Sequence, residues 1–200
     1  SKQKTRFPLC AVTPSEWMNK QAKSSTWSDH LVQTIHNPVP YSYFKNRDQD
    51  ACKRALGVIT EKPLVLCIAA DLEEERKGGN ILKEILSSEF DDVNFLLIGR
   101  TTNSIADHKE NIYSLGFIQD ELTMQIAYHA SDIVIHPAPI DNLPNTVAEA
   151  LSAGTPILSF KTGGLPEMVV SGKSGWLVPK INAQLMTREL HSILETCSYK

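Results

Sequence analysis

The chain has 200 residues, of which 42% are hydrophobic and 22% charged, which is enough apolar material for one sizeable core. Its 20 Lys and Arg residues face 23 Asp and Glu residues, so the formal net charge is −3. Proteins that bind nucleic acid need a basic excess to neutralise phosphates, so we expect no nucleic-acid partner. The composition also excludes a disordered, collagenous or miniprotein chain.

The cysteine and hydrophobicity patterns predict a cytoplasmic protein. The four cysteines stand far apart with no C-x-x-C spacing, which favours reduced thiols over a zinc ribbon or a dithiol redox site. The longest apolar stretch, Pro63 to Ala70, is far shorter than the roughly 20 residues that cross a bilayer. No signal-peptide pattern opens the chain, so we expect neither secretion nor a transmembrane segment.

The first part of the chain predicts a strand, a helix and a second strand. Phe7 to Thr13 has a strand pattern, Pro14 to Trp17 has the Pro and the acidic residue of a helix start, and Leu31 to Ile35 has a strand pattern again. Such a unit is too small for a core of its own. We therefore assign residues 1–36 to the remnant of a domain that is mostly absent from this sequence.

A proline-containing break follows this unit. His36 to Pro40 contains two prolines, which fix φ and disfavour helix in the residue before each. We assign residues 37–47 to a hinge and residues 48–200 to the main domain. Arg47 to Leu56 then predicts a short helix closed by Gly57.

From Leu64 to Val178 one pattern repeats: a short apolar run, a polar or Gly/Pro-containing loop, and an amphipathic helix. Continuous hydrophobicity is typical of strands buried on both faces of a parallel sheet. The predicted fold is an α/β, Rossmann-like, doubly wound parallel sheet flanked by helices, with right-handed crossovers. The apolar runs are Leu64–Ile68, Val93–Ile98, Ile112–Leu115, Ile133–Ile135 and Pro156–Phe160.

Apolar positions with helical spacing come after the apolar runs in the sequence. The predicted sheet also indicates which loops should bind ligands. Ligands in this architecture bind outside the carboxyl ends of the strands. The apolar positions with helical spacing are Ile81, Ile85 and Leu86, then Leu122, Ile126 and Ala127, then Val147, Leu151 and Val169–Val170. The loops expected at the binding edge are Asp71–Gly79, Gly99–Asn103, Gly116–Glu121, His136–Asn145 and Lys161–Pro166.

The most informative of these loops precedes a helix that begins near Pro144 and Asn145. A helix start at this edge presents free N–H groups and a positive dipole end, which suit a phosphate. Asp141 lies just before the helix, and Glu149 lies on it at i,i+4 spacing from Asn145. The two carboxylates could accept hydrogen bonds from vicinal hydroxyls on either side of the phosphate, for example from a sugar and a ribose.

These residues also carry a family resemblance. Asp141-x7-Glu149, the following Ala-Leu-x-Ala-Gly-Thr-Pro and the segment Gly163 to Glu167 closely resemble the Glu-x7-Glu region of retaining glycosyltransferases of the GT-B fold, glycosyltransferase family 4 (glycosyl transferases group 1). The agreement extends over Val65 to Val178 and includes Lys77-Gly78. The resemblance implies the C-terminal, donor-binding half of a GT-B fold in a nucleotide-sugar-dependent retaining hexosyltransferase, as in polysaccharide biosynthesis.

The resemblance also implies roles for individual residues. Asp141 stands where the family's first Glu binds donor-sugar hydroxyls, and Glu149 stands where the second Glu holds the ribose. Lys77 matches the lysine that neutralises the leaving diphosphate, where negative charge builds up in the transition state. Asp141 and Lys77 are the catalytic candidates. The other donor-binding candidates are the backbone amides of Leu143, Asn145 and Thr146 at the phosphate, Phe117 and Ile118 at the nucleobase, and Arg76.

Two positions depart from the family pattern. Asp71 stands where the family usually has an arginine, which reverses a charge at a diphosphate site. Arg76, Lys83 and Arg100 are candidates to compensate, and Arg76 is nearest in sequence. The first acid of the motif is an Asp, one methylene shorter than Glu, so the sugar could be seated differently.

We expect no cofactor and no catalytic metal. Asp48-Gln49-Asp50 spells the D-x-D of metal-dependent glycosyltransferases, but it opens a linker helix and does not end a strand. The expected partners are a nucleotide-sugar donor and an acceptor, either a sugar, a lipid-linked sugar or a polysaccharide end, held by the absent N-terminal domain. This chain alone should bind its donor without transferring the sugar, and the resemblance is compatible with peripheral membrane association of the full-length enzyme.

Other interpretations of the sequence stay open. A GT-B-type nucleotide-sugar isomerase or epimerase, a degenerate non-catalytic nucleotide-sugar-binding module and a flavodoxin-like receiver share parts of the pattern. Locally, Asp141 could simply cap a turn or helix, and Lys77 could close an exposed ion-pair run with the preceding glutamates. His36 and His136 have no metal-ligand or triad partner in the sequence and are interpreted as structural.

Overall fold

The computed structural model describes residues 9–90, 92–101 and 109–196. Phe7 and Pro8 of the first predicted strand, residues 102–103 of a predicted loop, and Cys197 lie outside the described residues. The three described cysteines, Cys10, Cys52 and Cys67, are free thiols.

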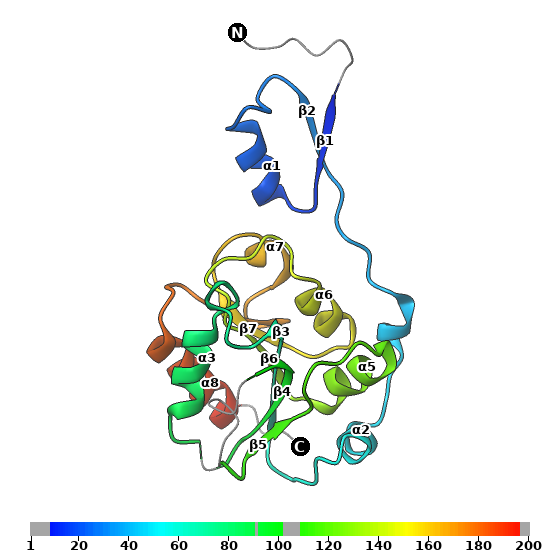
Figure 1. Ribbon diagram of the computed structural model, residues 1–200, viewed down its shortest axis with the longest axis vertical. Helices are drawn as coiled ribbons and strands as arrows, with labels where there is room; N and C mark the ends of the chain where they lie inside the picture. Colours follow the sequence, from blue (N-terminus) through cyan, green and yellow to red (C-terminus); the bar gives the residue numbers. More distant parts are fainter. Residues whose placement is uncertain (1–8, 91, 102–108, 197–200) are drawn as a thin grey trace.

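The N-terminal unit is a strand, a helix and a strand, as the sequence predicts. Strands β1 (Cys10–Thr13) and β2 (Leu31–Thr34) pair in parallel, and α1 (Glu16–Lys23) connects them. The Ser15 side chain caps α1 by accepting from the Met18 N–H. Figure 1 shows this unit above the main body, joined to it by a linker that contains the short 3-10 helix η1 (Tyr41–Phe44).

A six-stranded parallel sheet forms the centre of the main body, in the order β5-β4-β3-β6-β7-β8. Counted from the first strand of this sheet, the order is 3-2-1-4-5-6, the nucleotide-binding order and not the flavodoxin-like one. The Rossmann-like fold is thereby confirmed, and the receiver interpretation is wrong. The strands are β3 (Leu64–Asp71), β4 (Asn94–Arg100), β5 (Ile112–Ser114), β6 (Ile133–His136), β7 (Ile157–Phe160) and β8 (Gly175–Val178).

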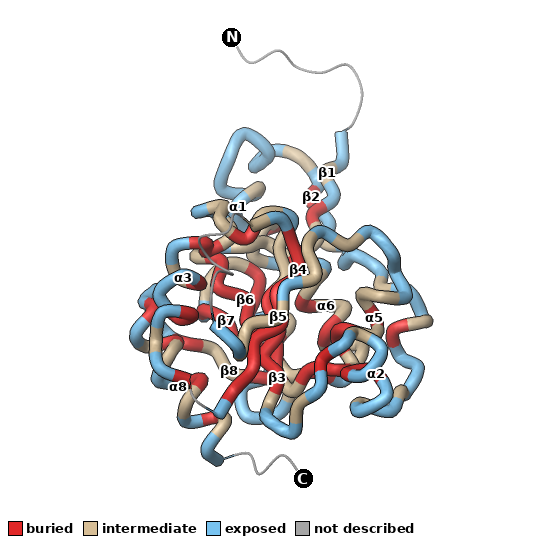
Figure 2. Tube along the Cα trace, turned by 60° about the horizontal axis from the view of Figure 1, so that its bottom comes forward, coloured by how far each residue is buried: buried red, intermediate tan, exposed pale blue. Residues whose placement is uncertain are grey.

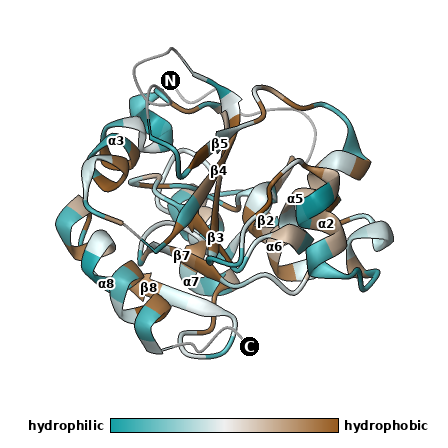
Figure 3. Ribbon diagram, turned by 90° about the horizontal axis from the view of Figure 1, so that it is seen from below, coloured by the Kyte–Doolittle hydropathy of each residue, from teal (hydrophilic) through white to brown (hydrophobic). Residues whose placement is uncertain are grey.

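Helices cover both faces of this sheet (Figures 1 and 3). One face packs against α3 (Gly79–Ser87) and α8 (Ala183–Thr196). The other packs against α2 (Gln49–Ala55), α5 (Glu121–Ala130) and α6 (Asn145–Ser152). Two short helices, η2 (Glu75–Lys77) and α7 (Leu165–Met168), lie in the loops after β3 and β7.

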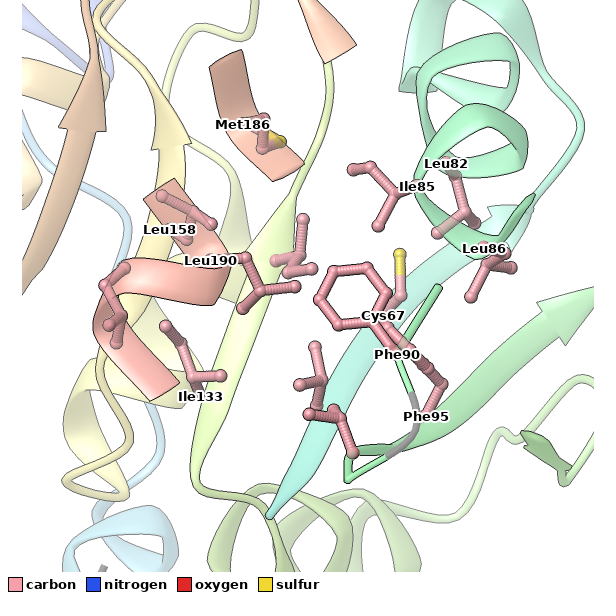
Figure 4. Packing of buried hydrophobic residues seen from close by; sticks show 14 of the residues in the cluster. Cys67, Leu82, Ile85, Leu86, Phe90, Phe95, Ile133, Leu158, Met186 and Leu190 are labelled. Atoms are coloured by element: carbon pink, nitrogen blue, oxygen red, sulfur yellow. The ribbon is translucent and has the colours of Figure 1, made fainter. Parts of the chain in front are cut away.

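Successive side chains of β3 enter different cores, which explains its continuous hydrophobicity. Leu64 and Leu66 join the cluster under α5 and α6, while Val65 and Cys67 join the cluster under α3 and α8. Figure 4 shows Cys67 in the second cluster together with side chains of α3 and α8. Figure 2 shows buried residues along the inner strands of the main sheet, namely β3, β4, β6 and β7. Burial on both faces favours apolar residues at successive positions along the strand.

Three details of the helical pattern differ from the prediction. Val169 and Val170 are not helical, because α7 ends at Met168 and Val169 is extended; β-branched residues fit that conformation well. Leu122 lies on α5 as predicted, but its side chain is 51% exposed. The sequence analysis also did not identify β8 and α8, the last strand and helix of the fold.

Substitution of Leu66 by Ala should lower the free energy of unfolding by about 3 kcal/mol, because the side chain is 0% exposed and its loss leaves a cavity. Leu122→Ala is the matched control and should cost less than about 0.5 kcal/mol, because Leu122 is half exposed. Urea unfolding of both variants checks the prediction. Equal midpoints would contradict the assignment of Leu66 to the core.

Candidate functional site

A cavity of about 410 Å³ opens at the carboxyl edge of the sheet between β3 and β6, where the strand order reverses. Ligands bind in such crevices in open α/β sheets. The end of β3 forms one wall and His136 ends β6, while Asn37 enters from the linker. Lys77, Asp141 and residues 143–146 complete the lining.

Lys77 and Asp141 form an ion pair inside this cavity. Lys77 Nζ lies 2.9 Å from Asp141 Oδ2, with the two side chains 29% and 17% exposed. The Lys77 ammonium group thus contacts a carboxylate in the cavity that lies 64 positions further along the chain. Gly78 allows the approach, because it has a φ of +86° and a Cβ there would lie 2.2 Å from the Pro137 carbonyl oxygen.

His136 lies against the same carboxylate. Its buried side chain is 7% exposed, and Nε2 lies 3.5 Å from Asp141 Oδ2. That distance is too long for a strong hydrogen bond, and Nε2 has no other hydrogen-bond partner in the described part of the chain. The interpretation of His136 as structural did not anticipate this contact with Asp141. The position of His136 at the end of a strand, on the edge of the sheet where ligands bind, could have indicated it.

Three groups therefore surround the Asp141 carboxylate: Lys77, His136 and the Asn142 N–H, which donates to Oδ1 at 2.8 Å. Burial by itself raises the pKa of this carboxyl group, but His136 and Lys77 together hold the pKa well below its usual range. Asp141 is thus a charged, mostly buried acceptor and does more than cap a turn.

The start of α6 forms the floor beside this pair. Pro144 precedes the helix and offers no side-chain cap, and its carbonyl accepts from Val147 and Ala148. Helix geometry leaves the N–H groups of Asn145 and Thr146 for an external acceptor. Both residues line the cavity, as does Leu143. The Asn145 side chain is held from the linker, because Asn37 Nδ2 donates to its Oδ1 at 3.1 Å.

Glu149 lies one helical turn further along α6, outside the residues that line the cavity. It accepts a hydrogen bond of 2.8 Å from the buried Tyr128 hydroxyl. Burial and the charge of Glu121 raise the pKa of the Glu149 carboxyl group, and the Tyr128 bond opposes that shift. Burial and the Glu149 and Glu121 charges raise the pKa of Tyr43 to about 12.

The structure does not bring all predicted residues into the cavity. Arg76 is 68% exposed and pairs with Glu74 at 2.9 Å. Phe117 and Ile118 follow β5 away from the cavity lining, and the Arg100 guanidinium lies 5.2 Å from the centre of the Phe117 ring. Asp71 accepts from the Glu73 N–H at 2.9 Å and so shapes the loop after β3.

A larger hollow of about 920 Å³ lies between α3 and α8 and contains Lys83 but neither catalytic candidate. It is built from two helices on one face of the sheet, and none of its lining residues lines the cavity that contains Lys77 and Asp141. Lys83 is therefore not placed to compensate for Asp71.

The N-terminal unit contacts the loops around the cavity. The Ser15 hydroxyl donates to the Asn142 side chain next to Asp141. The Glu167 carboxylate accepts from the N–H groups of Glu16 and Trp17 at 2.8 and 2.6 Å, which places a negative charge at the start of α1. These contacts were not predicted from the sequence, because they join residues that lie 127 to 151 positions apart. His36 donates a ring N–H to the Pro14 carbonyl, as a structural histidine would.

Two negative findings concern the described residues alone. They contain no group of three or more His, Cys, Asp and Glu side chains placed to hold a metal ion. They also contain no helix that is both long and apolar enough to cross a bilayer.

The family model of the glycosyl transferases group 1 matches residues 62–196. The chain belongs to this family. D-inositol 3-phosphate glycosyltransferase from Mycobacterium sp. (strain JLS) is 26% identical over 159 residues, which cover 74% of the chain and 36% of the relative. Membership in group 1 is confirmed; assignment to family 4 stays a prediction.

Solved structures agree on the fold of this group 1 chain. Sucrose-phosphate synthase from Thermosynechococcus elongatus superposes with a TM-score of 0.79 at 19% identity, covering 93% of this chain and 49% of the synthase. HepE from Anabaena in complex with UDP superposes with a TM-score of 0.77 at 20% identity, covering 96% and 56%. The chain thus spans about half the length of these two proteins.

The Asp141 contacts predict a specific pH dependence of stability. The folded pKa of Asp141 lies below the unfolded value of about 3.9, so its contribution is present at neutral pH and is lost as the pH falls. The free energy of unfolding of the wild type should therefore fall about 1 kcal/mol further than that of Asp141→Asn between pH 5 and pH 3. Urea unfolding at each pH measures this difference, and parallel curves would exclude the depressed pKa.

Proposed function

We propose that this chain is the donor-binding half of a retaining glycosyltransferase that uses a nucleoside-diphosphate sugar. One observation supports this most directly: a single cavity at the switch point of the sheet contains a lysine, a carboxylate and the start of a helix. The lysine and the helix start suit a diphosphate, and the carboxylate suits the hydroxyl groups of a sugar.

Each group has a distinct task in this proposal. The Asn145 and Thr146 N–H groups, with the Leu143 backbone beside them, bind the distal phosphate, and Lys77 neutralises the charge that builds up as the diphosphate leaves. Asp141 accepts hydrogen bonds from the sugar hydroxyls. Retention of anomeric configuration follows from the family resemblance.

The nucleoside occupies the side of the site beyond α6. Glu149, oriented by Tyr128, accepts from the ribose hydroxyls, and the turn at Phe117 and Ile118 contacts the nucleobase. Arg76 would have to leave Glu74 to reach the donor. The UDP bound to HepE is the kind of ligand that this arrangement suits.

The remaining expectations belong to the same proposal. The reaction needs no metal or cofactor, because Lys77 and the helix start supply the positive charge at the diphosphate. An N-terminal domain, of which residues 1–36 are the last part, binds the sugar, lipid-linked or polysaccharide acceptor, so this chain binds the donor without transferring the sugar. The whole enzyme acts in the cytoplasm, either free or at a membrane surface.

Thermal unfolding with UDP, GDP, ADP and their sugar conjugates tests the proposal. One nucleotide series should stabilise the chain by roughly 2.7 kcal/mol at about 100 times its dissociation constant, which raises Tm by several degrees. Lys77→Ala and Glu149→Ala should each reduce that shift, because they remove a diphosphate contact and a ribose contact.

Lys83→Ala is the matched control for Lys77→Ala, because Lys83 lies in the hollow between α3 and α8. It should retain the full ligand-induced shift. The donor-binding role would be excluded if no nucleotide at millimolar concentration changes Tm, or if the Lys77 and Lys83 variants respond alike.

A further inference from the structure

His136 has a place in the cavity that the proposed function leaves unexplained. It ends β6 directly beneath the Asp141 loop, and its side chain is 7% exposed. A polar ring nitrogen buried there is costly without a partner. Nε2 nevertheless makes no hydrogen bond in the described residues and faces Asp141 Oδ2 at 3.5 Å. The contact is close enough to become a hydrogen bond after a shift of about half an ångström.

Lys77 cannot serve Asp141 and a diphosphate equally well. It is the one Lys or Arg among the described residues that line the cavity, and in the structure it is bonded to Asp141 at 2.9 Å. A diphosphate at the start of α6 brings more negative charge than one carboxylate. The flexible, 29% exposed lysine side chain can turn toward it.

If Lys77 moved away, the negative charge of the Asp141 carboxylate would lose its ion-pair partner. Its carboxylate would retain the Asn142 N–H on Oδ1, while Oδ2 would lose the 2.9 Å hydrogen bond from Lys77. A buried carboxylate without a partner is unfavourable and tends to take up a proton. A protonated Asp141 could no longer accept two hydrogen bonds from a donor sugar.

We propose that His136 is a positioning residue that takes over Asp141 Oδ2 when Lys77 turns to the donor diphosphate. This inference rests on the proposed function, since it requires a diphosphate ligand in the cavity. While Lys77 is paired with Asp141, His136 adds only a long contact of 3.5 Å to the same carboxylate oxygen. Once the donor draws Lys77 away, His136 donates to Oδ2 and keeps the carboxylate charged and oriented toward the sugar.

A double-mutant cycle between His136 and Asp141 tests this exchange, with UDP, ADP and GDP as probes in isothermal titration calorimetry. His136→Leu should weaken binding of the accepted diphosphate about tenfold, because Lys77 must then leave an uncompensated carboxylate. In the Asp141→Asn background the same change should weaken binding less than about threefold, because a neutral amide needs no such compensation.

Two further variants separate positioning from structural damage. His136→Gln retains a side-chain N–H donor of similar reach and should restore binding to within about threefold of the wild type. His129→Leu is the matched control, because His129 on α5 also has a buried Nε2 without a hydrogen-bond partner among the described residues but does not line the cavity. It should leave the affinity unchanged in both backgrounds.

The outcomes distinguish this proposal from the donor-binding role. His136 acts only through packing if the wild type binds a diphosphate but His136→Leu has the same effect in the wild-type and Asp141→Asn backgrounds. The same conclusion follows if His136→Gln does not restore binding. If the wild type binds none of the three diphosphates, the proposed function fails, and the role of His136 fails with it.

Discussion

The burial of both faces of the parallel sheet is the constraint on which the rest of the structure depends. Alternate residues of β3 pack into opposite cores, so helices must cover both faces of the sheet. The loops that join strands to helices therefore lie at the edges of the sheet. The order of the strands then opens a crevice between β3 and β6. The loops that carry Lys77 and Asp141 converge there although the two residues are 64 positions apart.

The Asp141 carboxylate is the electrostatic centre of the resulting site. Burial opposes its charge, and Lys77 and His136 more than offset that effect. The same arrangement links three segments of the chain, namely the loop after β3, the end of β6 and the loop before α6. A ligand that draws Lys77 away must therefore change the contacts of the carboxylate, and this is the basis of the role that we propose for His136.

The site also extends into the linker and the N-terminal unit. Asn37 holds the Asn145 side chain at the start of α6, and Ser15 binds the Asn142 side chain beside Asp141. The Glu167 carboxylate accepts hydrogen bonds from two N–H groups at the N-terminal end of α1. The linker and the N-terminal unit thus contact the loop that would hold a phosphate and a sugar, without the N-terminal unit supplying the carboxylate itself.

The sequence by itself determined five of the six strands of the sheet, the class of fold, the family and the Lys77, Asp141 and Glu149 candidates, because buried parallel strands and a helix start with flanking carboxylates leave local patterns. Only the tertiary structure decided which of these residues meet. It paired Lys77 with Asp141, brought His136 and Asn37 to the same cavity, and left Arg76 with Glu74. The physical reason is that side-chain contacts between distant segments depend on strand order and loop approach, such as the close passage of Gly78 past Pro137, and neither leaves a periodic signal in the sequence.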